Sequence, residues 1–370
     1  MNSLTWVEAF CHGLNKWQQK NLAMLMDAMF ERQISILNEL ASAIAFGTGV
    51  GLNHCIKRLQ RFLGNHRFID EAVSRALIRF IWPRLKTWRY IPVVIDWTCN
   101  EKEVDKWTTL VASIPLRGRG IPLMAWSFPK GDLGGYLSQN RLEEAFLSNL
   151  LSLIPPEDLG RLVIIADRGF GRASLFRYLK KRNIHFVIRV KMNVSVKSTE
   201  HTGLLGEIFV SPYTLRSLGK TLYKAQGEDA VELRQLVICY QDEVTEDGAI
   251  DPWFLATDLS LSAKSIQEFY SKRMIIEEDL REAKSHLLWK SCRIRKAEHY
   301  QRFTTVLILV LALATLVGHT IHRRPTLNRL VSRKRQGKTD TSTTLTGLRF
   351  LKHSLDNLKY ARLGRLPSPL

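Results

Sequence analysis

The stretch RLVIIADRGF, residues 161–170, joins a short apolar run to an acid and a glycine turn. Such a run is typical of a buried β-strand, and Asp167 follows directly after it. YIPVVID (90–96) repeats the pattern and ends in Asp96. A carboxylate at the end of a buried strand loses hydration unless it is paired or binds a cation. Either aspartate alone is more typical of a loop start or a helix N-cap, but two at matching positions favour a functional pair.

The segments around these two strands predict a mixed α/β core. The further runs are the strands TTLVASIPL (108–116), IPLMAWSF (121–128) and HFVIRVK (185–191), and the helices RLEEAFLSNLLSLI (141–154) and ASLFRYLKKRN (173–183). RGRG (117–120) lies between the first two of these strands and predicts a glycine turn, so the first three strands should form an antiparallel meander. The expected order is strand-strand-strand-helix-strand-helix-strand.

Changes in periodicity and polarity divide the chain into five regions. They are 1–90, helical and a candidate DNA-binding region; 91–191, the first part of the core; 192–255, a β-rich insertion; 256–300, a helix that completes the core; and 301–370, helical and basic. One long helix is expected from about 262 to 289. The basic residues of 1–90 fit a solvated helical bundle as well as a DNA-binding surface. SRKRQGK (332–338) predicts a basic surface or a mobile tail.

The charge balance points to a polyanionic partner. Lys and Arg number 54 against 35 acids, which gives a net charge of +19. Such an excess suits nucleic acid or an anionic membrane surface, and the plain alternative is a solvated basic surface without a partner.

Cysteine usage and hydropathy bear on the cellular compartment. The five cysteines are scattered and never spaced as C-x-x-C, which predicts a reduced, cytoplasmic protein without a disulfide framework. The N-terminus lacks the layout of a signal peptide. FTTVLILVLALATLVG (303–318) is shorter than a spanning helix needs and contains threonines, so we expect a buried core helix and no membrane association.

A second pattern lies in EFYSKRMIIEEDLREAKSH (268–286). On a helix, Tyr270, Arg273, Glu277 and Lys284 fall within about 60° of one another, whereas the neighbouring acids point elsewhere. The carboxylate of such a stripe can complete a divalent-metal site, while the cations and the phenol hold phosphates on either side. The alternative is an exposed helix with salt bridges between residues four apart, such as Arg273 with Glu277.

The spacing Y-x-x-R-x-x-x-E-x-x-x-x-x-x-K resembles the signature of bacterial insertion-sequence DDE transposases of the large group named after insertion sequence four. Asp167-Arg168-Gly169-Phe170 is similar to the second-aspartate motif of that family, D-x-G-F/Y, and Asp96 after VVI resembles the first aspartate. The resemblance covers about residues 90–300, including the β-rich insertion. Residues 1–90 and 320–370 match only in helical and basic character.

This resemblance implies an RNase H-like catalytic core, a mixed sheet with flanking helices, interrupted by the β-rich insertion. Its acids, Asp96, Asp167 and Glu277, would bind two Mg²⁺ ions, for which Mn²⁺ would substitute. Contacts to DNA phosphates would come from the rest of the stripe, Tyr270, Arg273 and Lys284. Trp253 looks like the tryptophan on which relatives stack a flipped base, and plain strand packing is the equal alternative. Some relatives carry a tryptophan directly after the motif arginine, where this chain has Met274.

The function implied is cut-and-paste DNA transposition. The enzyme would cleave the inverted ends of its own element, through a hairpin or another route, and join them to target DNA as a synaptic dimer at the nucleoid in the cytoplasm. Two alternatives remain at this point: a metal-dependent nuclease without strand transfer, and a decayed copy that only binds DNA.

Overall fold

The structure, a computed structural model, describes residues 2–68, 70–100, 107–116, 118–133, 138–240, 251–331, 334–335, 338–339, 341–362 and 366. The side chains of the basic run 332–338, for which a basic surface or tail is predicted, lie outside the described residues.

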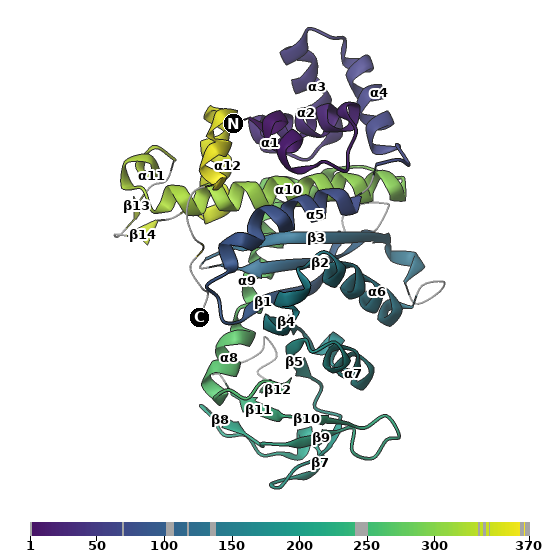
Figure 1. Cartoon of the computed structure of the whole chain (residues 1–370), viewed down its shortest axis with the longest axis vertical. Helices are drawn as coiled ribbons and strands as arrows, with labels where there is room; N and C mark the ends of the chain where they lie inside the picture. The colour runs from purple at the N-terminus through teal and green to yellow at the C-terminus, as the bar shows by residue number, and fades with distance from the viewer. Residues whose placement is uncertain are drawn as a thin grey trace. The chain divides into compact units, whose positions relative to one another are not determined.

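The main sheet combines parallel and antiparallel strands (Figure 1). Its strands are β1 (Ile91–Asn100), β2 (Trp107–Pro115), β3 (Gly120–Pro129), β4 (Leu162–Ala166), β5 (His185–Val190), β8 (Leu215–Ser217), β11 (Gln235–Cys239) and β12 (Trp253–Thr257). In the described part of the chain this sheet has eight strands, in the order β3-β2-β1-β4-β5-β12-β11-β8. β4 pairs in parallel with β1 and β5, whereas β2 with β3 and β5 with β12 are antiparallel. The predicted mixed α/β fold is confirmed, and it is consistent with an RNase H-like core.

The region predicted as a β-rich insertion contributes to two sheets. Strands β8, β11 and β12 extend the main sheet. The others are β6 (Ser195–Lys197), β7 (Thr202–Leu204), β9 (Thr221–Tyr223) and β10 (Val231–Leu233), which form a separate sheet in the order β10-β9-β6-β7. The pairing of β12 with β5 therefore joins the insertion to the strands that precede it.

Helices make up most of the remaining chain, and several begin at polar caps. They are α1 (Ser3–Phe10), α2 (Lys16–Arg32), α3 (Leu37–Thr48), α4 (Leu52–Leu63), α5 (Asp70–Ile81), α6 (Gln139–Ser152), α7 (Ala173–Lys181), α8 (Ala263–Ser271), α9 (Arg273–His286), α10 (Ala297–His322), α11 (Pro325–Val331) and α12 (Thr343–His353). Asn15 and Gln18 form a reciprocal capping box at the start of α2, and the Ser342 side chain caps α12.

The prediction of one helix over about 262–289 is wrong. The chain forms α8 and α9 instead, and Lys272 separates them. Residues 263–286 contain neither glycine nor proline and are compatible with helix throughout, so the sequence gives no signal for this break. Tyr270 therefore lies on α8, whereas the other three residues of the stripe lie on α9.

Contacts divide the described chain into two compact units. The first unit comprises Met1–Thr87, Trp97–Leu153 and Ile275–Pro369, and the second comprises Trp88–Asp96 and Ile154–Met274. In the first unit, the apolar helix α10 packs against β3, α12, α2 and α5. In the second, the core lies along β4, β5 and β12, which are almost entirely buried.

The apolar segment 303–318 lies within α10. By length and composition α10 resembles a membrane span, but 94% of its most apolar window is buried inside the protein, so it gives no evidence for a membrane. The expectation of a buried core helix is confirmed. The five cysteines all lie among the described residues and are free, as predicted.

Candidate active site

The two predicted aspartates lie at neighbouring strands, Asp96 within β1 and Asp167 directly after β4, and both belong to the second unit. β1 and β4 run in parallel with Ile95 opposite Ala166, so Asp96 and Asp167 each follow a paired residue. Adjacent strands are about 4.8 Å apart, which places the two carboxyl groups at the same part of the sheet. One detail of the prediction is wrong: β4 ends before Asp167, but Asp96 lies inside β1, which continues to Asn100.

Two residues of the predicted stripe contact these acids. Arg273 Nη1 donates to Asp96 Oδ2 at 3.4 Å, and both side chains are about 15% exposed (14% and 16%). Tyr270 Oη donates to Asp167 Oδ1 at 3.3 Å. Burial raises the pKa of Tyr270, so the phenol keeps its proton at neutral pH and can serve only as a donor to the carboxylate.

Trp253 and Arg189 complete the surroundings of Tyr270. The Trp253 ring meets the Tyr270 ring edge-on, with centroids 4.9 Å apart, and remains partly exposed at the start of β12. Arg189 on β5 acts electrostatically on Tyr270 and pairs with Asp251. Arg189 was not predicted as a site residue, although a basic residue inside the apolar run HFVIRV is a signal that could have identified it.

Glu277 and Lys284 both lie on α9, half-buried, in the first unit. Among the described residues, no group of three His, Cys, Asp or Glu side chains could hold a metal ion. Asp96, Asp167, Tyr270 and Arg273 therefore lie together in the second unit, whereas Glu277 and Lys284 belong to the first. The pair Asp96 and Asp167 nevertheless fits Mg²⁺, because this ion takes hard oxygen ligands and is often held by one or two carboxylates plus water and phosphate.

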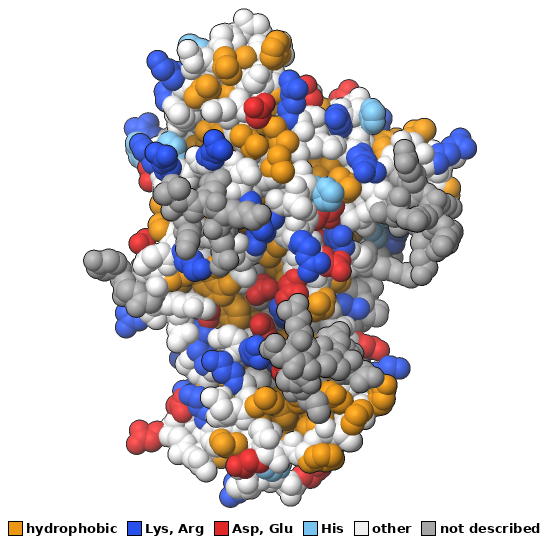
Figure 2. Space-filling model, turned by 180° about the vertical axis from the view of Figure 1, so that it is seen from behind, with side chains coloured by type: hydrophobic (Ala, Val, Ile, Leu, Met, Phe, Trp, Pro, Cys, Tyr) orange, Lys and Arg blue, Asp and Glu red, His pale blue; other side chains and the backbone are white. Residues whose placement is uncertain are grey.

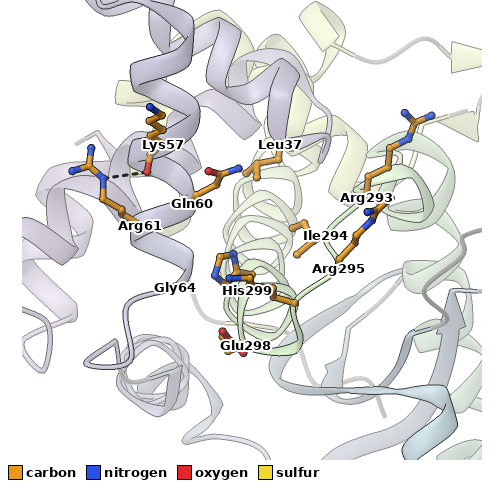
Figure 3. Close-up of a pocket in the computed structure, with 11 residues that line it drawn as sticks. Leu37, Lys57, Gln60, Arg61, Gly64, Arg293, Ile294, Arg295, Glu298 and His299 are labelled. Atoms are coloured by element: carbon orange, nitrogen blue, oxygen red, sulfur yellow. Dashed lines mark hydrogen bonds between the residues drawn. The ribbon is translucent and has the colours of Figure 1, made fainter.

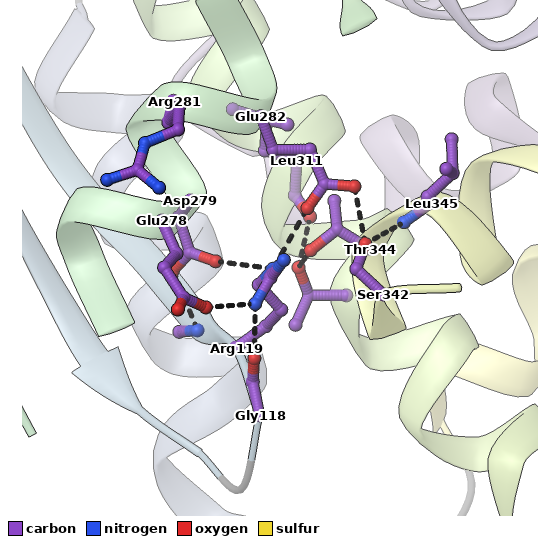
Figure 4. A network of polar contacts seen from close by, with 12 residues as sticks. Gly118, Arg119, Glu278, Asp279, Arg281, Glu282, Leu311, Ser342, Thr344 and Leu345 are labelled. Carbon is purple, nitrogen blue, oxygen red and sulfur yellow. Dashed lines mark hydrogen bonds and ion pairs between the residues drawn. The ribbon is translucent and has the colours of Figure 1, made fainter. Parts of the chain in front are cut away.

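The acids of α9 that lie off the stripe have a different partner, which sequence reasoning missed (Figure 4). Arg119, from the turn before β3, contacts Glu278 at 2.6 Å, Glu282 at 2.9 Å and Asp279 at 3.5 Å. The Gly120 N–H donates to Asp279 at 2.7 Å, and the Ser342 hydroxyl donates to Glu282. The crowded acids of α9 thus hold the helix against β3 and the start of α12 within the first unit. We refer to these residues as the Arg119 network.

The segment that carries this site also resembles a known family. Residues 138–313 match the family described as the transposase DDE domain. The match includes Asp167, Trp253 and the whole stripe from Tyr270 to Lys284, whereas Asp96 precedes it. It supports a DDE transposase, a class that transfers phosphoryl groups on DNA and generally uses divalent metal ions. No curated protein matches the chain.

Proposed function

We propose that this chain is a DNA transposase that cleaves the ends of its own insertion sequence and joins them to target DNA. The observation that carries the proposal is the pair Asp96 and Asp167, which directly follow a paired position of the adjacent parallel strands β1 and β4 and are contacted by Arg273 and Tyr270. Acids of this kind are needed for metal-dependent phosphoryl transfer, and the contacting residues suit DNA phosphates. The transposase DDE match supports the same chemistry.

Each residue of the site has a role in this proposal. Asp96, Asp167 and Glu277 would hold two Mg²⁺ ions, or Mn²⁺ in their place, which activate the attacking oxygen and stabilise the leaving one. Arg273 and Tyr270 now contact the two aspartates. When cations take up the negative charge of the acids, these two side chains can donate to phosphate oxygens instead, and Lys284 adds a further positive charge.

The remaining parts of the proposal follow from the resemblance to the insertion-sequence family. Trp253 would stack a flipped base, since its ring lies beside that of Tyr270 and the residue is partly exposed. Cleavage would proceed through a hairpin or another strand-processing route, in a synaptic dimer that holds both inverted repeats. The protein would act at the nucleoid in the cytoplasm.

The test is DNA cleavage with Mg²⁺ or Mn²⁺ on a duplex that carries the terminal repeats flanking this gene. We expect the natural chain to cut at the repeat boundary, and Asp167→Asn and Glu277→Gln each to lower the rate at least ~100-fold, because a metal ligand contributes several kcal/mol. Glu278→Gln is the matched control: it changes the neighbouring acid, which contacts Arg119 and is half exposed, and should leave cleavage nearly unchanged.

The other outcomes separate the alternatives. Cutting that persists in both variants means that the acids are assigned wrongly. A natural chain that cuts but never joins a 3′ end to a second duplex is a nuclease without strand transfer. A chain that binds the ends but cuts under no divalent metal is a DNA-binding protein without this catalysis.

A further inference from the structure

A groove in the first unit is lined by several positively charged side chains (Figure 3). Its volume is about 890 Å³, and it lies between α4, the segment 293–296 and the first turn of α10. Eleven described residues line it; five of these are cations, and the one acid among them is Glu298. The cations are Lys57, Arg61, Arg293, Arg295 and Lys296, all of which are exposed.

The sequence of α4 explains one wall of the groove. Lys57, Gln60, Arg61 and Gly64 are spaced by three, four and seven residues, so they share one face. The opposite face of the helix, which includes Leu59 and Phe62, is buried in the core.

The other wall is the segment RIRK (293–296). Ile294 points into the protein and is 6% exposed, while Arg293 and Arg295 on either side of it face solvent. Arg293 has φ of 49°, a left-handed conformation that costs energy in a side-chain-bearing residue. An exposed arginine is thus held in a conformation that glycine would adopt more easily.

Both walls are anchored to the scaffold. Trp107 Nε1 donates to the Ile294 carbonyl at 3.1 Å, and the Trp107 ring stacks on Tyr300 with centroids 4.4 Å apart. On the α4 side, the buried Arg302 donates to the Leu63 carbonyl. A Cβ at Gly64 would lie 2.8 Å from His299 Nε2, so a larger residue at the end of α4 would require the His299 side chain of α10 to move.

The charge and form of the groove indicate its ligand. Five cations around one groove repel one another, and an anionic ligand removes that repulsion. A pocket for a small organic molecule is lined mainly by apolar side chains that enclose the ligand, whereas this lining is charged and exposed. A flat bilayer would reach only the rims of a groove, but the phosphate backbone of a duplex is a narrow anionic ridge that can contact both walls.

We infer that this groove binds the phosphate backbone of duplex DNA through both walls, as a sequence-independent contact formed by residues other than those of the candidate active site. The inference rests on the proposed function, because it takes DNA as the partner. Lys and Arg side chains also recur over the face of the molecule shown in Figure 2, so a test must compare the groove with cations elsewhere.

The experiment measures binding to a fluorescent 40-base-pair duplex of arbitrary sequence, in EDTA and over a range of salt concentrations. One variant changes the α4 wall, Lys57→Gln with Arg61→Gln, and a second changes the opposite wall, Arg293→Gln with Arg295→Gln. The control removes the same charge from exposed positions outside the groove, Lys20→Gln with Lys352→Gln. Thermal unfolding of each variant shows whether it is folded.

We expect each wall variant to bind DNA at least ~10-fold more weakly, and the slope of log K against log salt to be less steep by about 2, since two phosphate contacts are lost. The control should change affinity by about twofold or less. Glu298→Gln, which removes the acid, should tighten binding about twofold.

Other results would overturn the inference. Wall variants that bind with the natural affinity and salt slope would show that the groove does not contact DNA. A loss confined to one wall would exclude a backbone seated between both. If the variants lose binding to vesicles of phosphatidylserine and phosphatidylcholine but keep DNA binding, the groove is a membrane site. Because binding in EDTA needs no cleavage, failure of the catalytic proposal would be seen separately, as absent cutting by the natural chain.

Discussion

At the scale of single residues, the hydroxyl group of Tyr270 donates the hydrogen bond that connects the stripe to Asp167. Tyr270→Phe removes this donor and keeps the ring against Trp253. A hydrogen bond to a charged group contributes about 1.5–3 kcal/mol, so we expect cleavage to fall about 10-fold or more while the protein stays folded. Single-turnover cleavage together with thermal unfolding measures both effects.

The matched control for this substitution is Tyr213→Phe, since Tyr213 is a tyrosine of the same unit whose side chain is 75% exposed. Its cleavage rate should equal that of the natural chain. If Tyr270→Phe also cleaves at the natural rate, Tyr270 serves only to pack against Trp253.

Local sequence patterns predicted most residues of the candidate site, whereas the contacts set by tertiary packing could be seen only in the structure. The sequence predicted Asp96, Asp167 and the stripe because each follows a local rule of strand or helix spacing. It could not predict Arg119, whose partners are about 160 residues away in the chain. The contact of Arg273 with Asp96, 177 residues away in the chain, is likewise a matter of tertiary packing.

At the scale of elements, the Arg119 network connects α9 to β3 and α12. Arg119→Gln leaves Asp279 and Glu282 with mostly buried charge that lacks its cation. We expect the free energy of unfolding to fall by about 3 kcal/mol at neutral pH, as for other broken buried pairs. Arg216→Gln is the control, because Arg216 and Glu200 are both about half exposed and should contribute less than about 1 kcal/mol.

The loss caused by Arg119→Gln should depend on pH. Burial raises the pKa of Asp279 well above 3.8, so the folded protein holds this proton more tightly than the unfolded chain does. Stability from this group is therefore present at low pH and decreases as pH rises above about 4. Without Arg119 the pKa rises further, so the variant should lose more stability at pH 8 than at pH 5. An equal loss at both values, measured by urea unfolding, would mean that Asp279 is not the group affected.

Helices α10 and α12 meet at two glycines. A Cβ at Gly347 would lie 1.8 Å from the Ala314 carbonyl oxygen, and one at Gly318 would lie 1.7 Å from that of Thr343. Gly347→Ala must therefore separate the helices, and we expect a loss of about 1–3 kcal/mol or more in chemical unfolding. Gly47→Ala on α3, where a Cβ meets nothing within 4 Å, should instead stabilise by about 0.5–1 kcal/mol. Equal effects at both positions would contradict this account of the helix contact.

Local periodicity gave most elements of the core, from β1 to β5, close to their observed bounds. It failed where long-range contacts decide the outcome. The break at Lys272 has no local signal, and a β-rich region does not reveal that three of its strands join the main sheet. Pairing of β12 with β5 joins residues more than 60 positions apart, which a pattern of alternating residues cannot specify.

At the scale of the whole molecule, each of the two units is built from separate stretches of the chain. The bounds of the transposase DDE match, 138–313, coincide with neither unit. A fragment of residues 138–313 would end within α10 and lack β3, α12 and α2, against which α10 packs. We expect it to unfold without a cooperative transition and to bind a hydrophobic dye, whereas the full chain melts cooperatively. A cooperative melt of the fragment, followed by circular dichroism, would show that the match is a self-sufficient folding unit.

The burial of α10 has a consequence for hydrogen exchange. Backbone amides in the middle of this helix are covered by a strand on one side and by helices on others, so a local fluctuation does not bring them to water. Deuterium uptake in a peptide covering 303–318 would then proceed only when the first unit opens as a whole. The rate of deuterium uptake in this apolar stretch, which by composition alone resembles a membrane anchor, would thus report how often the whole first unit opens.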